Sequence, residues 1–155
     1  MAASRPTEMK THLTRLARMA QHEFARRLRQ SNAGRLFGFE LEAAEPGRAV
    51  ILMRVRPKHR QVHGVVHGGI LAALADTAAG VACYMALPRG TRLATIEMKI
   101  NYLEAVEKGV LRAEARVLRC GKTTAVAECD IRDADVRLVA KALMTFSIGK
   151  REVET

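Results

Sequence analysis

The chain has 155 residues, of which 48% are hydrophobic and 27% are charged, a composition typical of a single globular domain. A chain of this length can bury enough surface to fold without disulfide bonds. Its three cysteines, Cys83, Cys120 and Cys129, have neither a CxxC spacing nor another common metal-binding spacing. These features exclude a disulfide-rich secreted scaffold, and reduced cysteines predict a cytoplasmic location.

The net charge of +10 favours an anionic partner, such as a nucleic acid, an anionic membrane or a phosphorylated cofactor. However, the chain contains no helix-turn-helix, zinc-finger or RRM pattern, and only 4% of its residues are aromatic. No apolar run reaches the ~20 residues of a membrane-spanning helix, since the closest window, 70–87, contains Asp76 and Gly80. We therefore expect neither a nucleic-acid partner nor a membrane partner.

The first predicted element is an amphipathic helix over residues 8–30, which follows a disordered tail at 1–7. Its apolar side chains recur every three or four residues, at Met9, Leu13, Leu16, Ala20, Phe24 and Leu28. Arginines occupy the other face, so a mitochondrial transit peptide is an alternative interpretation, which Glu8 and Glu23 disfavour. We assign residues 1–33 to the tail and this helix.

Two extended runs follow, at 36–42 and 49–55, on either side of Glu45-Pro46-Gly47, and they predict a β-hairpin. Pro57 ends the second strand, and residues 58–66 predict a polar loop. Histidines at 59, 63 and 67 have helical spacing, but Gly64 and two valines interrupt the segment. We therefore expect no metal site there.

Residues 68–86 predict a long helix in which Asp76 is the only charged residue from Gly68 to Met85. A helix that is apolar on nearly all sides is expected to be buried, and a buried carboxylate is costly unless it is paired. A catalytic role for Asp76 is one feature that would account for this cost. A helical wheel places a stripe toward the sheet, at Ile70, Leu74, Ala78, Val81 and Met85, and places Asp76 opposite it, among Ala72, Ala73, Ala79, Gly80 and Cys83.

The remaining segments, 95–102, 110–119, 123–131 and 136–147, alternate apolar and polar residues and predict strands with one polar face. Strict alternation puts Thr95 on the polar face of its strand, and the turns between segments predict a meander of hairpins. The fold class is therefore α+β, with one antiparallel sheet wrapped around the long helix. Residues 34–149 form this domain, and 150–155 form a tail.

Four motifs occur in order along this domain: Gln61-x5-His67-Gly68-Gly69, Leu74-Ala75-Asp76-Thr77, Thr95 to Leu103, and Val117 to Thr123. Together they resemble the hotdog-fold acyl-CoA thioesterases of the phenylacetic-acid-degradation (PaaI) type, near the 4-hydroxybenzoyl-CoA thioesterases. The resemblance implies a hotdog fold and hydrolysis of an acyl-CoA to a free acid and coenzyme A. It implies no metal and no redox cofactor.

The same resemblance implies roles for individual residues. Gly68 would offer its backbone N–H to the thioester carbonyl, and Asp76 would act as general base or nucleophile. His67 and Gln61 would shape the site, and Thr95 would help to place the water. A further group matches segments that contact coenzyme A in the family: Tyr102, Arg119, Gly121, Lys122 and Thr123.

The spacing of Gly68 and Asp76 adds a physical constraint. Eight residues of helix separate them by about 12 Å along the axis, so the two groups of one helix cannot serve one carbonyl. We therefore expect a homo-oligomer whose sites combine Gly68 of one subunit with Asp76 of another. The resemblance implies the same kind of shared site, in a dimer or a dimer of dimers. Two alternatives are a non-catalytic acyl-CoA sensor and a basic nucleic-acid-binding protein. The sequence decides neither the acyl group nor the hydrolytic route.

Overall fold

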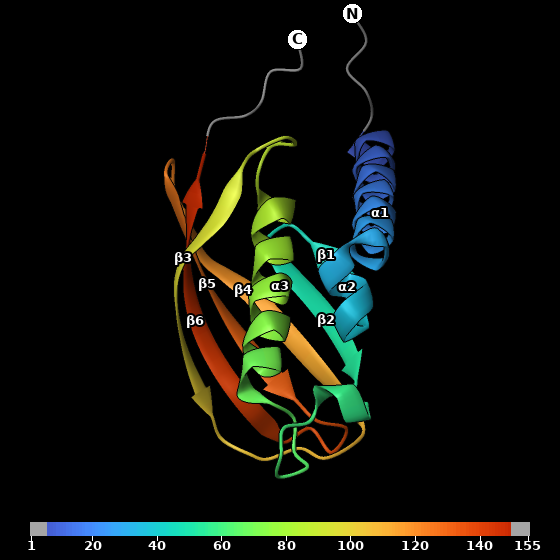
Figure 1. Cartoon of the computed structure of the whole chain (residues 1–155). Helices are drawn as coiled ribbons and strands as arrows, with labels where there is room; N and C mark the ends of the chain where they lie inside the picture. The colour runs from blue at the N-terminus through green and yellow to red at the C-terminus, as the bar shows by residue number, and fades with distance from the viewer. Residues whose placement is uncertain (1–5, 150–155) are drawn as a thin grey trace, which may run out of the picture.

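A computed structural model describes residues 6–149 of the chain, with side chains described from residue 18 onward (Figure 1). The predicted tails, 1–7 and 150–155, lie outside this range except for Pro6 and Thr7, which are helical. The helical elements are α1 (Pro6–Gln30), α2 (Asn32–Phe37), the 3₁₀ turn η1 (Pro57–His59) and α3 (Gly68–Ala86). The strands are β1 (Phe39–Glu45), β2 (Arg48–Arg54), β3 (Leu93–Tyr102), β4 (Val110–Cys120), β5 (Thr124–Arg132) and β6 (Leu138–Ile148).

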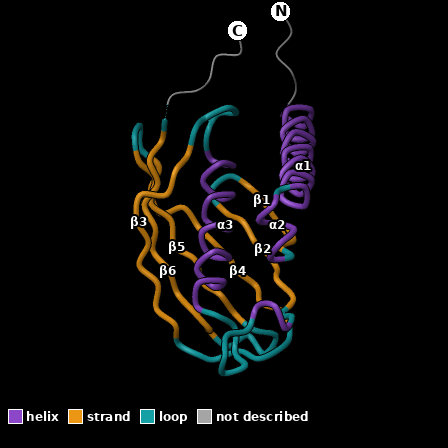
Figure 2. The backbone as a smooth tube through the Cα atoms, viewed as in Figure 1, coloured by secondary structure: helices purple, strands orange, loops and turns teal. Residues whose placement is uncertain are grey.

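The six strands form one antiparallel sheet in the order β1-β2-β4-β5-β6-β3, and the sheet curves around α3 (Figures 1 and 2). Alternate side chains of β4, β5 and β6 are buried against the helix, as period-two patterns require. The α+β class and the bounds of the central helix are both confirmed.

The predicted meander is only partly right. β4, β5 and β6 are joined as successive hairpins, but β3 does not pair with β4. Instead it lies at the edge of the sheet and pairs with β6, the last strand. The turn predicted between β3 and β4, at Lys108-Gly109, therefore does not close a hairpin. A local turn signal cannot reveal this, because the partner of β3 lies more than 30 residues further along the chain.

The start of the first strand is also a correction, because residues 36 and 37, which we predicted to be extended, belong to the short helix α2. The side chain of Ser31 caps this helix by accepting a hydrogen bond from Gly34 N at 2.9 Å. Gly38 ends it in the left-handed conformation, with φ of 69°. Our proposed domain boundary, between residues 33 and 34, falls within this helix.

Helix α3 is buried along a wider face than the wheel predicted. Eight of its residues are buried, and they include Leu71, Ala75 and Ala82, which were not in the predicted stripe. They also include Ala79 and Cys83, which were assigned to the opposite side, whereas Ile70 and Met85 are only partly buried. The reason is that the sheet curls around the helix, and small alanine side chains let several strands approach it at once.

The same helix is long and apolar enough to cross a membrane by length and composition. Its buried face packs against β2, β4 and β5 in the core of the domain, so we interpret it as a core helix. Core helices of soluble proteins often have a similar length and composition.

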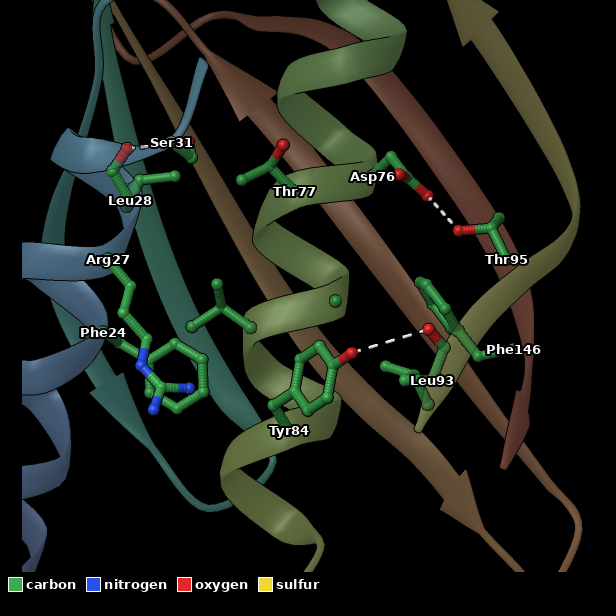
Figure 3. Close-up of a pocket in the computed structure, with 12 residues that line it drawn as sticks. Phe24, Arg27, Leu28, Ser31, Asp76, Thr77, Tyr84, Leu93, Thr95 and Phe146 are labelled. Carbon is green, nitrogen blue, oxygen red and sulfur yellow. Dashed lines mark hydrogen bonds between the residues drawn. The ribbon is translucent and has the colours of Figure 1, made fainter. Parts of the chain in front are cut away.

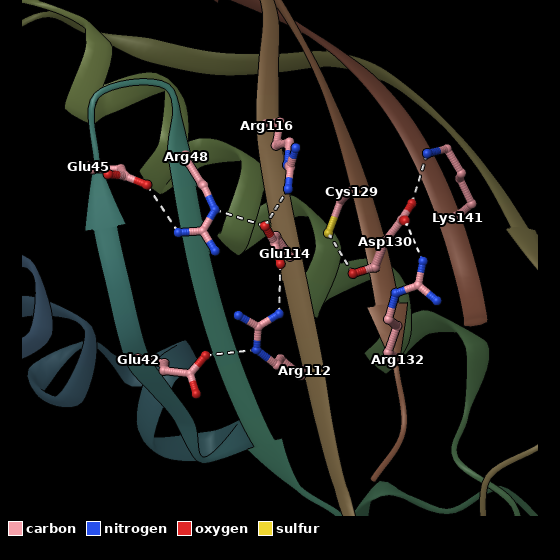
Figure 4. A network of polar contacts seen from close by, with 10 residues as sticks. All are labelled: Glu42, Glu45, Arg48, Arg112, Glu114, Arg116, Cys129, Asp130, Arg132 and Lys141. Carbon is pink, nitrogen blue, oxygen red and sulfur yellow. Dashed lines mark hydrogen bonds and ion pairs between the residues drawn. The ribbon is translucent and has the colours of Figure 1, made fainter. Parts of the chain in front are cut away.

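The outer face of the sheet carries paired charges (Figure 4). Glu114 on β4 accepts hydrogen bonds from three arginines, Arg48 at 2.8 Å, Arg112 at 2.7 Å and Arg116 at 3.0 Å. These arginines lower the pKa of Glu114 to about 2. A second cluster lies beside it, where Asp130 pairs with Arg132 and Lys141. Part of the strongly basic composition is therefore used in ion pairs on this face.

Candidate active site

Asp76 and Thr95 are brought together between α3 and β3 (Figure 3). The hydroxyl of Thr95 donates a hydrogen bond to Oδ1 of Asp76 at 2.7 Å. This is the one hydrogen bond that the Asp76 carboxylate makes with the described residues, and no cation of that part of the chain pairs with it. Its Oδ2 atom is therefore available to a water molecule or a substrate.

Thr95 reaches Asp76 because β3 contains a β-bulge. The register of β3 against β6 shifts between Thr95 and Glu97, so Ile96 is the extra residue. The bulge turns Thr95 toward the helix, while Glu97 points outward and accepts a hydrogen bond from Thr145 at 3.0 Å. The strict alternation that placed Thr95 on the polar outer face was therefore wrong. The same alternation predicts that the next residue, Ile96, points inward, whereas it is 58% exposed.

The expectation that Asp76 is buried also needs correction. In the single chain Asp76 is half-buried, because it lies at the boundary of the helix face that the sheet covers. A groove of about 330 Å³ opens beside it, between α1, α3 and β3. The carboxylate thus lies on the wall of a solvent-accessible groove instead of inside the core.

Gly68 is the first residue of α3, whereas Asp76 lies near the middle of the helix. His67 caps the helix, because its Nδ1 atom accepts a hydrogen bond from Gly69 N at 2.9 Å. Gly68 N–H has no acceptor among residues 6–149, so it can donate to a ligand. Tyr102 lies against this glycine, since a Cβ atom added at residue 68 would be 3.1 Å from Cζ of the tyrosine.

The loop before α3 is held by its own hydrogen bonds. The side-chain Oε1 of Gln61 accepts from His63 N at 2.9 Å, and Gln61 N donates to Val65 O at 2.8 Å. His59 is buried at 1% exposure, and its backbone carbonyl accepts from His67 N at 2.9 Å. Burial lowers the pKa of His59, as do the nearby charges of Lys58 and Arg56. The sequence suggested only a possible metal-ligand role for His59. It did not predict that this buried residue would support the loop before α3.

Four of the five candidate coenzyme A residues lie on the hairpin between β4 and β5. Arg119, Lys122 and Thr123 are exposed there, and Gly121 closes the turn by donating from its N–H to Thr124 O at 2.8 Å. Ile148 N donates to Thr123 O at 2.8 Å, and Ile148 pairs with Leu93 at the start of β3. The hairpin therefore lies at the end of the sheet where β3 begins.

The candidate residues thus fall into separate groups within one chain. His67, Gly68 and Tyr102 gather at the N-terminus of α3, and Gln61 lies in the loop before it. Asp76 lies further along the helix, bonded to Thr95 of β3. The β4–β5 hairpin lies at the end of the sheet where β3 begins, and Tyr102, grouped with it by resemblance, lies near Gly68 instead. Within residues 6–149 there is no group of three or more His, Cys, Asp or Glu side chains that could hold a metal ion.

The cysteines do not belong to this site. All three thiols are free, and Cys83 and Cys129 are buried. Burial raises the pKa of Cys83 to about 11 and that of Cys129 to about 12, so neither is a reactive thiolate near neutral pH. Cys120 is exposed at the end of β4.

Several residues that line the groove beside Asp76 belong to none of the four motifs. Phe24 and Leu28 come from α1, Tyr84 from α3, and Phe146 from β6 (Figure 3). Phe24 and Leu28 were recognised as the apolar face of an amphipathic helix, which indicates burial but not the partner. The apolar face of this helix was therefore the one sequence signal for these groove residues, although it did not indicate a functional site.

Comparison with known proteins relates this chain to thioesterases. The model of the thioesterase superfamily matches residues 63–140, which include Gly68, Asp76, Thr95 and the β4–β5 hairpin. A 1,4-dihydroxy-2-naphthoyl-CoA hydrolase of Listeria monocytogenes is 29% identical over 74% of this chain and 93% of its own length.

Solved structures of thioesterases also superpose on this chain. A thioesterase of Haemophilus influenzae superposes with a TM-score of 0.76 and 27% identity, covering 83% of this chain and 89% of its own. A hypothetical thioesterase of Streptococcus pneumoniae, solved with coenzyme A, has a TM-score of 0.71 and 28% identity, covering 77% and 92%. The expected hotdog fold is thereby confirmed.

Proposed function

The chain belongs to the thioesterase superfamily and is a thioester hydrolase, and from this premise we propose that it hydrolyses acyl-CoA thioesters to a free acid and coenzyme A. The observation that carries the proposal is the Asp76 carboxylate on the groove wall, with one oxygen bound to Thr95 and the other available. In this proposal the Thr95 hydroxyl orients the carboxylate toward a water or a thioester carbon.

The second catalytic group is the backbone N–H of Gly68. A helix N-terminus carries about half a positive charge, which suits the negative oxygen that develops during thioester hydrolysis. Because this N–H lies about 12 Å from Asp76 along α3, we propose that each site pairs Asp76 of one subunit with Gly68 of another. The separation of the two groups within one chain supports such a shared site, in a dimer or a dimer of dimers.

The reaction balances with these groups alone. In the general-base route, Asp76 accepts a proton from water while the water oxygen attacks the thioester carbon. The carbonyl oxygen receives the hydrogen bond from Gly68 N–H in the tetrahedral intermediate. The C–S bond then breaks, coenzyme A leaves as the thiolate and takes up the proton that Asp76 had accepted, and the free acid remains. This route uses no metal and no redox cofactor.

A covalent route is the alternative. Asp76 would attack the thioester carbon itself, and water would then hydrolyse the resulting mixed anhydride. A single turnover in ¹⁸O-labelled water separates the two routes. Label found in Asp76 after one turnover would exclude the simple general-base route, because only the anhydride exchanges a carboxylate oxygen.

The remaining candidates are proposed to bind the substrate. Arg119 and Lys122 are exposed cations that suit the phosphates of coenzyme A, and Gly121 and Thr123 belong to the same hairpin. Tyr102 lies beside Gly68, and His67 and Gln61 hold the loop that leads into α3, so these three shape the carbonyl site. A cytoplasmic location remains a prediction.

A thiol-release assay over a panel of acyl-CoAs tests the proposed reaction. We expect the wild-type protein to release free coenzyme A from at least one acyl- or aryl-CoA, and Asp76→Ala to release it at the background rate. Absence of hydrolysis across short-chain, long-chain and aryl substrates would refute the proposal and would favour an acyl-CoA sensor instead.

Mixing subunits tests the shared site. Asp76→Ala and Gly68→Pro chains are refolded together and the mixed oligomers are separated by distinct affinity tags. We expect mixed dimers to regain activity, because each contains one site with an intact Asp76 and an intact Gly68. Verified mixed dimers that remain as inactive as the two parents would show that a site uses both residues of the same chain.

A further inference from the structure

The groove beside Asp76 extends well past the catalytic carboxylate. It has a volume of about 330 Å³, near the lower end of the ~300–1,000 Å³ typical of small-molecule pockets. Figure 3 shows that α1 lines one side of it and β3 the other, with α3 between them. Asp76 and Thr95 lie on the side of β3, so a group bound along the groove would lead from the reacting carbon toward α1.

Helix α1 supplies an apolar wall of this groove through Phe24 and Leu28. The ring of Phe24 lies 6.0 Å from that of Tyr84 on α3, measured between centroids, at an interplanar angle of 37°. With Phe146, three of the six aromatic side chains in the chain line one groove. This concentration indicates a surface built to contact an apolar group.

The position of α1 over the groove is fixed by contacts at both of its sides. Glu23 pairs with Arg89, which follows the C-terminus of α3, and also with Arg27 on its own helix. On the other side, the side-chain amide of Gln21 donates to Glu42 O on β1 at 3.4 Å. The wall is therefore held against both the central helix and the sheet.

Gly80 forms the floor of the groove. A Cβ atom added there would have no atom within 4 Å, so packing inside the chain does not require glycine. Glycine inside a helix is destabilising relative to alanine, so its presence needs another reason. It follows Asp76 by four residues and precedes Tyr84 by four, which places it on the same helix face between the carboxylate and the aromatic wall.

We propose that this groove is the acyl pocket and that Phe24, Leu28 and Gly80 determine which acyl groups are accepted, an inference that rests on the proposed acyl-CoA hydrolysis. The pocket takes a compact apolar acyl group, either aryl or of medium chain length. Asp76 and Tyr84 are about 12 Å apart along the helix, which limits the depth available to a straight chain. The N-terminal helix is then part of the substrate site and not an accessory to the domain.

The test compares substrate profiles of three variants. Gly80→Leu fills the floor of the groove with the side chain of a good helix former. Leu28→Ala removes a side chain from the α1 wall and so enlarges the groove, and Met19→Ala is the matched control. Met19 lies on the same helix, is 59% exposed and does not line the groove. For each protein, kcat/KM is measured with straight-chain acyl-CoAs from acetyl to palmitoyl and with benzoyl-CoA, and the melting temperature confirms folding.

We expect Gly80→Leu to lower kcat/KM for octanoyl- and benzoyl-CoA by about tenfold or more relative to the shortest acyl-CoA that the wild type hydrolyses. Leu28→Ala should raise the ratio of long-chain to medium-chain substrates several-fold, and Met19→Ala should keep the wild-type profile. Unchanged profiles in both groove variants would overturn the proposal. If the two groove variants changed only the mass of the oligomer measured by sedimentation, the groove would be occupied by a second copy of the chain and not by an acyl group.

The failure of this inference differs from failure of the proposed function. If the wild type hydrolyses no acyl-CoA, the function itself is refuted. If it hydrolyses acyl-CoAs and the groove variants keep its preference, hydrolysis stands and the acyl group binds elsewhere.

Discussion

Two carboxylates of this protein, Asp76 and Glu114, have opposite surroundings. Glu114, on the outer face of the sheet, is bound by three guanidinium groups, and its pKa falls to about 2 (Figure 4). Asp76, on the groove wall, is bound by one neutral hydroxyl and no cation of the described chain. The comparison teaches that a fully neutralised carboxylate contributes to stability, whereas a carboxylate with a free oxygen is available for chemistry.

Replacing Asp76 should have the largest effect on activity. Asp76→Asn keeps the size of the side chain and an acceptor for the Thr95 hydroxyl, but it is neither a base nor a nucleophile. We expect kcat/KM to fall by about 10²–10⁴-fold, measured by thiol release. The melting temperature should change little, because the half-buried carboxylate has no charge partner among the described residues. Activity within tenfold of the wild type would place the catalytic carboxylate elsewhere.

Gly68→Pro should have the next largest effect, because it removes the N–H that we propose polarises the carbonyl. Proline is tolerated at the first position of a helix, and loss of one such donor costs about 10²–10³ in kcat. Gly68→Ala is the matched control, since it adds a Cβ 3.1 Å from the Tyr102 ring but keeps the N–H. If both variants lose the same activity, crowding against Tyr102 is responsible and the N–H is not.

Thr95→Val should have a moderate effect. Valine has nearly the shape of threonine but cannot donate to Asp76, so the carboxylate loses its orienting hydrogen bond of 2.7 Å. We expect kcat to fall about tenfold, equivalent to about 1.4 kcal/mol. Thr95→Ser restores the hydroxyl and should recover most of the rate. A serine variant as slow as the valine variant would indicate that the methyl group, and not the hydroxyl, is what matters.

Glu114→Gln should have the smallest effect on activity and a clear effect on stability. Losing hydrogen bonds to charged groups costs roughly 1.5–3 kcal/mol, which is about 4–10 °C in melting temperature for a chain of this size. The pKa of Glu114 is lowered to about 2 on folding, so its stabilisation is complete above the ordinary value near 4.5 and is lost as the pH falls toward 2.

Denaturant unfolding at a series of pH values measures this contribution. The wild type should lose more stability than Glu114→Gln between about pH 4.5 and pH 2, while both hydrolyse substrate equally at pH 7. A loss of activity in Glu114→Gln would mean that the outer face takes part in catalysis, and the comparison with Asp76 would fail.

The sequence predicted the fold where residue patterns are local. Helix α3 begins at Gly68 and ends at Ala86, as its apolar run indicated, and the alternation of β4, β5 and β6 placed their inner faces correctly. The pairing of β3 with β6 was not predictable in this way, because it depends on how the curved sheet closes around the helix. For the same reason the buried arc of α3 was wider than the apolar stripe.

For the candidate site, the motifs identified Asp76 and Thr95, but periodicity alone placed Thr95 on the wrong face. One inserted residue, Ile96, reverses the direction of Thr95, and a bulge has no distinct signature in an alternating sequence. The sequence also could not predict that Phe24 and Leu28 line the groove. An amphipathic pattern shows which face of a helix is buried, but not which element that face packs against.

The position of β3 at the sheet edge has a consequence for the order of biosynthesis. Within the described chain β3 pairs with β6 alone, and Thr95 lies opposite Phe146 in that pairing. Long-range pairings of this kind form late, because the intervening chain must be ordered first. During synthesis, Asp76 and its helix emerge well before the strand that holds Thr95 in place. The proposed catalytic pair therefore forms only when β6 has left the ribosome.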